Sequence, residues 1–236
     1  MYLAKFLSSQ GLCSRRKAAI LVKSGQVMVN GQVTINPAWL VTATDEVICQ
    51  GQIVSRMAKQ QHCYLLFNKP AKLITSLIDE RGRQTVISYL ASRGLVQRVL
   101  PVGRLDYLTT GLLLLSDDGD FIQQMSHPRF ALAKHYQITL SRPFAKADFA
   151  QLARGVILED GFIKPDKLAI INSQQTVISL EIHSGRNRII RRIFAFLGYK
   201  LVALHRTQVG PYALGDLPIG AWKVIARPAL AKAQDI

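Results

Sequence analysis

One carboxylate occupies a position in the sequence that suits chemistry. Asp106 lies in the stretch Pro101–Phe121 (PVGRLDYLTTGLLLLSDDGDF), after an expected strand over Val102–Leu105 and before a Thr-Thr-Gly turn. A carboxylate at such a junction can be held rigidly at the mouth of a pocket. A single aspartate in a loop is more often a turn residue, so the position alone leaves both roles open.

Three further aspartates, Asp117, Asp118 and Asp120, surround Gly119. They do not form a calcium loop of the EF-hand type, because no acidic residue occupies the twelfth position. We expect a turn and then a helix that begins near residue 120, with Asp120 as its N-cap. The five histidines and three cysteines show no metal-ligand spacing, so no metal site is predicted.

The cysteines also bear on the compartment. Cys13, Cys49 and Cys63 are odd in number, widely spaced and without a CxxC pair. A disulfide framework or a redox motif is therefore not expected, and the pattern suits a reducing cytoplasm. We expect all three side chains to lie in cores or interfaces.

A second stretch with chemical potential runs from Ile182 to Gly210 (IHSGRNRIIRRIFAFLGYKLVALHRTQVG). Its periodicity predicts a helix that ends at Gly198. The expected apolar face consists of Ile189, Ile190, Ile193, Phe194 and Phe196. Helical spacing places Arg188, Arg191 and Arg192 together on another face.

No acidic residue balances these cations, because the chain from His183 to Arg206 has six Lys or Arg and no Asp or Glu. A solvated basic face is the simplest explanation. The missing glutamates favour instead an external anion, or a buried carboxylate that comes from elsewhere in the fold.

The whole chain is basic as well. Its 236 residues include 30 Lys or Arg against 15 Asp or Glu, a formal net charge of +15. Such an excess favours a polyanionic partner, with nucleic acid ahead of an anionic membrane surface. No apolar run approaches the ~20 residues of a membrane helix. No GxGxxG or P-loop motif for a nucleotide cofactor occurs.

Two blocks of the chain must position these groups. The polar stretch Ser55–Gln61 predicts a linker between domains over residues 1–58 and 62–236. In the first block we expect a helix over residues 2–7 that Gly11 ends. A second helix begins after the N-cap Ser14, with Ala18, Ile20, Leu21 and Val22 as its apolar positions.

The first block continues with VMVNG and VTIN, a pattern typical of a β-hairpin with an Asn-Gly turn. Arg15, Arg16 and Lys17 lie in the first turn of the second helix, where the helix dipole disfavours cations. A bound phosphate would resolve this conflict, whereas the alternative is a solvated face.

The second block alternates short strands and helices without a βαβ rhythm. We expect strands over residues 64–68, 112–115, 136–140 and 176–183 and a helix over 85–90. This order predicts an α+β fold with a mixed, mostly antiparallel sheet.

Residues 2–34 (YLAKFLSSQGLCSRRKAAILVKSGQVMVNGQVT) resemble the alpha-L, or S4-type, RNA-binding domain, on the SRR of the second helix and the VNG hairpin. This resemblance implies that Arg15, Arg16 and Lys17 lie against RNA, with Lys5 as a further cation of the same block.

The second block resembles the RsuA/RluB/RluE/RluF family of pseudouridine synthases. The resemblance rests on six motifs in the family's order: NKP (68–70), GRLDxxTxGLLLLSxDG (103–119), HP (127–128), KxY (134–136), GRNRxxRR (185–192) and LxR (204–206). It covers nearly the whole chain.

The resemblance implies site residues and their roles. Asp106 is the nucleophile, Arg191 the cation that keeps it ionised, and Tyr136 the ring that stacks on the uracil and takes part in proton transfer. Arg104 holds the extruded nucleotide or fills the gap that it leaves. The implied RNA contacts of this block are completed by Arg186, Arg188 and Arg192.

The implied reaction needs no metal and no cofactor, because it breaks the N1–C1′ bond of uridine and rejoins the base through C5 without redox change. The sequence leaves open whether Asp106 attacks C1′ or C6 or acts through a glycal. Two positions depart from the family: Ile189 stands where Gln is usual, and Lys72 where Gly is frequent.

The sequence therefore predicts a cytoplasmic pseudouridine synthase that acts on ribosomal RNA. Large-subunit rRNA is favoured, because GRNR and GLLLLSDDGD resemble the RluB/RluF branch. The alternatives are small-subunit rRNA as substrate and a non-catalytic RNA-binding or ribosome-assembly factor on the same scaffold. A glycosidase ranks last, because it needs two carboxylates and only Asp106 has a motif.

Overall fold

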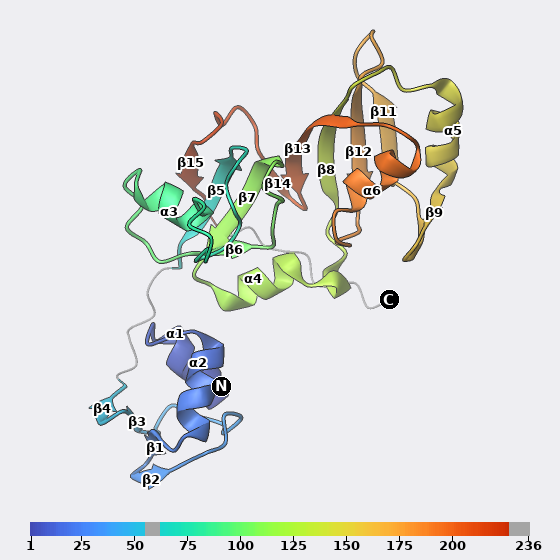
Figure 1. Cartoon of the computed structure of the whole chain (residues 1–236). Coiled ribbons are helices and arrows are strands. Elements are labelled where there is room, and N and C mark those ends of the chain that lie inside the picture. Colours follow the sequence, from blue (N-terminus) through green and yellow to red (C-terminus); the bar gives the residue numbers. More distant parts are fainter. Residues whose placement is uncertain (55–61, 227–236) are drawn as a thin grey trace. The chain divides into compact units, whose positions relative to one another are not determined.

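A computed structural model describes residues 1–54 and 62–226, and the chain divides into two compact units, Met1–Gln61 and His62–Ile236 (Figure 1). The linker expected at Ser55–Gln61 lies outside the described residues. Each unit has its own hydrophobic core.

The first unit contains two helices and a small antiparallel sheet. The elements are α1 (Leu3–Ser9), α2 (Arg15–Lys23), β1 (Val27–Val29), β2 (Gln32–Val33), β3 (Val47–Cys49) and β4 (Gln52–Ile53), with the strand order β2-β1-β3-β4. Ser14 caps α2 by accepting the Lys17 amide at 3.2 Å, as expected. One expectation is wrong: Ile20 is 65 % exposed, and the α2 face that packs on α1 and the sheet is formed by Ala18 and Val22.

The second unit is built on a nine-stranded sheet in the order β11-β12-β8-β13-β7-β5-β15, with β14 paired to β13 and β6 to β7. Its strands are β5 (Tyr64–Lys69), β6 (Leu100–Val102), β7 (Thr110–Ser116), β8 (Lys134–Leu140), β11 (Lys167–Ile170), β12 (Val177–Ile182), β13 (Leu201–Val209), β14 (Tyr212–Ala213) and β15 (Trp222–Val224). A separate hairpin consists of β9 (Val156–Leu158) and β10 (Gly161–Ile163).

The helices of this unit are α3 (Val86–Ala91), α4 (Gly119–Ser126), α5 (Lys146–Arg154), α6 (Ile189–Phe196) and the single 3-10 turn η1 (Pro128–Phe130). All strand pairs in the large sheet are antiparallel except β7 with β13, which are parallel. The fold is therefore α+β with a mixed, mostly antiparallel sheet, as predicted.

Three local expectations for this unit are wrong. The strand before Asp106 is Leu100–Val102 and not Val102–Leu105, because Gly103 turns the chain with a φ of +71°. The N-cap of α4 is Asp118, which accepts the amides of residues 120 and 121, and not Asp120. Phe196 is 53 % exposed and does not belong to the buried face of α6.

The parallel pair β7–β13 depends on a glycine. A Cβ at Gly111 would lie 2.2 and 2.6 Å from the backbone O and N of Arg206, and the φ of Gly111 is +101°. No side chain fits between two backbones at that distance. This close approach joins the β5–β7 half of the sheet to the β8–β13 half.

We expect Gly111→Ala to lower the free energy of unfolding by about 2–5 kcal/mol, because the strands must separate and the backbone is strained. Urea unfolding followed by circular dichroism measures the change. Gly119→Ala is the matched control, since its Cβ would meet nothing within 4 Å. Equal stability of the two variants would contradict this account of the strand contact.

Candidate active site

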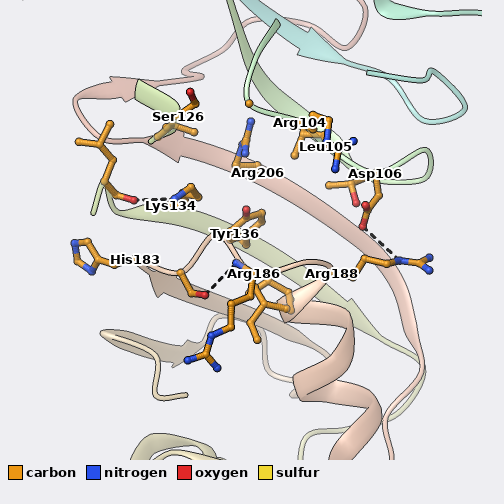
Figure 2. A pocket seen from close by; sticks show the side chains of 18 of the residues that line it. Arg104, Leu105, Asp106, Ser126, Lys134, Tyr136, His183, Arg186, Arg188 and Arg206 are labelled. Atoms are coloured by element: carbon orange, nitrogen blue, oxygen red, sulfur yellow. Dashed lines mark hydrogen bonds and ion pairs between the residues drawn. The ribbon is translucent and has the colours of Figure 1, made fainter. Parts of the chain in front are cut away.

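A cleft of about 600 Å³ opens in the second unit (Figure 2). Its walls are the loop before β7, the strands β8 and β13, the region from the end of α4 through η1, and the loop that leads into α6. Six of the residues singled out from the sequence line it: Arg104, Asp106, Tyr136, Arg186, Arg188 and Arg191. The structure thus brings Asp106, Tyr136 and Arg191 into one cavity although they lie far apart in the chain.

The carboxylate of Asp106 faces two guanidinium groups. Its Oδ2 lies 3.5 Å from Nε of Arg191 and 3.8 Å from Nε of Arg188. The Arg191 side chain is only 23 % exposed, against 61 % for Arg188, so Arg191 is the less hydrated partner. Arg191 Nη2 also donates to the hydroxyl of Thr109 at 3.3 Å, which holds the guanidinium beside the loop. A carboxylate next to a partly buried cation has a geometry that suits a nucleophile.

The local fold of α6 explains why Arg191 points into the cleft. Ile189, Ile190, Ile193 and Phe194 are buried against the core, so Arg191 occupies the opposite side of the helix. The chain enters the helix through Arg188, whose φ of +48° is left-handed.

The other two arginines of this motif bind a second carboxylate. Arg192 donates two hydrogen bonds to Asp160, and Arg186 lies 3.5 Å from the same group. These hydrogen bonds lower the pKa of Asp160. The arginines of this motif therefore face two carboxylates, Asp106 and Asp160, but neither is buried as the sequence led us to expect: their side chains are 36 % and 41 % exposed. Arg192 does not line the cleft, and its RNA contact stays a prediction.

A buried lysine fixes the backbone that carries Asp106. Lys69, at the end of β5, has no exposed surface, and its Nζ donates to the carbonyls of Asp106 at 3.2 Å and Thr109 at 2.9 Å. Burial lowers the pKa of Lys69 to about 8, although the nearby Asp106 opposes this shift. Lys69 thus joins strand β5 to the loop that carries Asp106 through charge-assisted hydrogen bonds.

We expect turnover to fall as the pH rises through about 8, where Lys69 loses its proton and the loop loses a cationic donor. An unfolded lysine keeps its proton to a higher pH than Lys69 does in the folded protein. Above pH 8 the unfolded chain therefore binds more protons, and the folded state becomes more stable as the pH rises. The expected loss is thus one of activity and not of stability. Rates of turnover between pH 6.5 and 9.5 measure the effect.

The test variant is Lys69→Met, which should be slow at every pH and lack the alkaline decline. Lys223→Met is the control, because Lys223 is exposed on β15, does not line the cleft and should keep the decline. An unchanged alkaline limb in Lys69→Met would assign the decline to another group.

Tyr136 contributes an aromatic surface from β8. It is half-buried, packs against the core cluster around α6 and lines the cleft. Lys134 lies on the same face of the strand two residues earlier, and Arg206 is the register partner of Tyr136 on β13.

The cations expected to bind RNA in the first unit lie on and around α2. Arg15, Arg16 and Lys17 are exposed in its first turn, and Lys5 on α1 is partly buried. No acidic residue occupies that turn. This surface is suited to phosphate groups.

Four residues at the site carry roles that the sequence did not assign: Lys69, Thr109, Lys134 and Arg206. Each belongs to one of the six motifs, but only the fold shows what its side chain contacts. Within residues 1–54 and 62–226, no cluster of three or more His, Cys, Asp or Glu is arranged to hold a metal ion. No helix in those ranges is long and apolar enough to span a bilayer.

Comparison with known proteins places both units in described families. The RNA pseudouridylate synthase family matches residues 63–196, and the S4 domain matches residues 1–47. Ribosomal large subunit pseudouridine synthase B of Bacillus subtilis is 36 % identical over 222 residues, covering 92 % of this chain and 89 % of the relative.

Two more relatives cover almost the full length. An uncharacterized RNA pseudouridine synthase of Aquifex aeolicus is 35 % identical over 97 % of this chain and 91 % of its own. A crystal structure of a pseudouridylate synthase superposes with a TM-score of 0.65 at 28 % identity, over 96 % of both chains.

Proposed function

We propose a substrate and a nucleophile for this chain, which belongs to the RNA pseudouridylate synthase family and is an RNA pseudouridine synthase. The substrate is a uridine of ribosomal RNA, and the nucleophile is Asp106. Large-subunit rRNA is the favoured substrate, since the Bacillus subtilis relative is named for that subunit. The proposal rests on one observation: the Asp106 carboxylate lies beside Arg191 and Arg188 in a cleft that Tyr136 also lines.

The reaction conserves atoms and electrons. The N1–C1′ bond of uridine breaks, the base turns, C5 bonds to C1′, the C5 proton leaves and N1 gains a proton. Asp106 assists departure of the base as the nucleophile, and any bond that it forms to the nucleotide breaks when C5 bonds to C1′, so the free carboxylate returns. Arg191 balances the charge of that carboxylate before and after the reaction. No oxidant, reductant or bound cofactor takes part in this sequence of bonds.

The uridine must leave its stack to reach Asp106. Tyr136 offers a ring on which the uracil can stack, worth ~1–3 kcal/mol per base. Arg104, at the rim of the same cleft, is placed to hold the extruded nucleotide or to fill its gap. Contacts between RNA phosphates and the cations of both units supply the binding energy that offsets extrusion. We propose cytoplasmic rRNA as this partner.

Tritium release from C5-tritiated transcripts tests the proposal. Large- and small-subunit rRNA transcripts are incubated separately with the full-length enzyme. We expect release from the large-subunit transcript. Release from the small-subunit transcript alone would make that RNA the substrate, and release from neither would contradict rRNA as the target.

The first unit should supply RNA affinity. We expect the double variant Arg15→Gln/Arg16→Gln to bind the rRNA transcript more weakly and to lower the slope of log K against log salt by up to about two, one for each lost phosphate contact. Fluorescence anisotropy over a salt series measures this. Lys223→Gln is the control for loss of an exposed cation. An unchanged slope in the double variant would show that the α2 surface does not contact RNA.

A further inference from the structure

Arg206 is a buried guanidinium that forms no ion pair with another described residue. It is only 5 % exposed, and its Nε donates to the carbonyl of Leu112 at 2.9 Å. None of the ion pairs between described residues includes Arg206. A buried charge is costly unless an anion or several hydrogen-bond acceptors compensate it. The side chain lines the cleft, so its terminal nitrogens can meet a ligand there.

A second cation lies next to Arg206. Lys134 occupies the same face of the sheet and donates to the carbonyl of Leu132 at 3.1 Å. Burial, and then the charge of Arg206, lower the pKa of Lys134. Like Arg206, Lys134 forms no ion pair among the described residues. Two neighbouring cations with no acid between them repel each other until an anion binds.

The two cations lie apart from the nucleophile. Figure 2 shows Lys134 and Arg206 beside Tyr136 and away from Asp106 and Arg188. The negative charge of Asp106 is already shared by Arg191 and Arg188. The cleft therefore has a nucleophile end and a second, uncompensated basic end, and its volume of about 600 Å³ suits a nucleotide with an attached phosphate.

We propose that Lys134 and Arg206 form a subsite for one backbone phosphate of the RNA, beside the uridine that Asp106 attacks. An arginine binds phosphate through two parallel N–H groups and a lysine adds a point charge. The phosphate held there fixes the ribose, so that the uracil lies on Tyr136 with its glycosidic bond at Asp106. This inference rests on the proposed role of Asp106 for the position of the uridine.

Binding measurements test the subsite without turnover. The full-length Asp106→Asn protein is titrated with an rRNA fragment over a salt series, alone and with Lys134→Met or Arg206→Met added. Each added change should weaken binding about tenfold or more at low salt and lower the salt slope by about one. Lys134→Arg should keep the slope, and Lys223→Met is the control for an exposed cation outside the cleft. If Arg206→Met does not fold, the test is decided by Lys134→Met alone.

Ethylation interference on the same fragment identifies the phosphate. One ethylated phosphate should weaken binding to the Asp106→Asn protein and have a clearly smaller effect once Lys134→Met is added, and it should adjoin the uridine that the active enzyme modifies. An unchanged salt slope, or the same interference pattern in both proteins, would overturn the subsite. Lys134 and Arg206 would then contact the uracil or serve only the stability of the fold. Failure of the proposed function is separate, because it appears as absent tritium release from rRNA by the unaltered enzyme.

Discussion

Asp106→Asn is expected to reduce tritium release from C5-tritiated RNA by at least about 10³-fold, because loss of a nucleophile removes the step on which catalysis depends. Asparagine has nearly the same shape as aspartate, so Arg191 and Arg188 keep their space but lose their counter-charge. RNA should bind at least as well as before, since the change removes a negative charge from a cleft that receives a polyanion.

The control for this result is Asp216→Asn, which makes the same chemical change at an exposed aspartate outside the cleft. It should release tritium at the unaltered rate. Release by Asp106→Asn within tenfold of the parent enzyme would remove Asp106 from the chemistry. Equal loss in both variants would indicate a general effect of charge on the protein.

Local rules predicted many elements of the fold because their causes lie within a few residues. Ser14 accepts an amide at the start of α2, and the Asn30-Gly31 turn has the left-handed φ values of +50° and +77°. The α4 cap was missed because three aspartates compete within four positions. Only the fold decides among them: the hydroxyl of Tyr64 on β5 donates to Asp118 at 2.8 Å.

The sequence motifs predicted which residues belong to the site. They did not predict contacts between residues on different strands or distant loops. Lys69 reaches carbonyls 37 and 40 residues further along the chain, a contact that no local pattern encodes. Asp160 meets Arg192 across 32 residues because the β9–β10 hairpin turns toward α6. The pairing of Arg206 with Tyr136 follows from strand register, which the sequence did not determine.

Lys72 shows how structure explains a departure from the family pattern. The family often has Gly at this position, and Lys72 adopts a left-handed φ of +66° while its amide donates to the Tyr107 carbonyl at 2.7 Å. Glycine adopts that conformation without strain, whereas lysine does so at a cost. The contact holds the Asp106 loop, so the conformation is kept even with the less suitable residue.

Arg191→Met is expected to lower turnover by about 10²–10³-fold, or about 2.7–4.1 kcal/mol of activation free energy, because it leaves the charge of Asp106 without its less exposed partner. The loss should appear in kcat, while the affinity for RNA changes by less than about threefold. This separation follows from the geometry: Arg191 is 23 % exposed and directed at Asp106 and Thr109, not at the surface.

Arg188→Met is the matched control, since Arg188 faces the same carboxylate at 3.8 Å but is 61 % exposed. Water screens an exposed pair, so its loss should affect turnover by less than about tenfold. As a cation at the rim it should instead reduce the salt slope of RNA binding by about one. Single-turnover tritium release and anisotropy on the same RNA measure both quantities. Equal loss of turnover and of binding in Arg191→Met would make Arg191 a phosphate contact and leave Asp106 without its assigned cation.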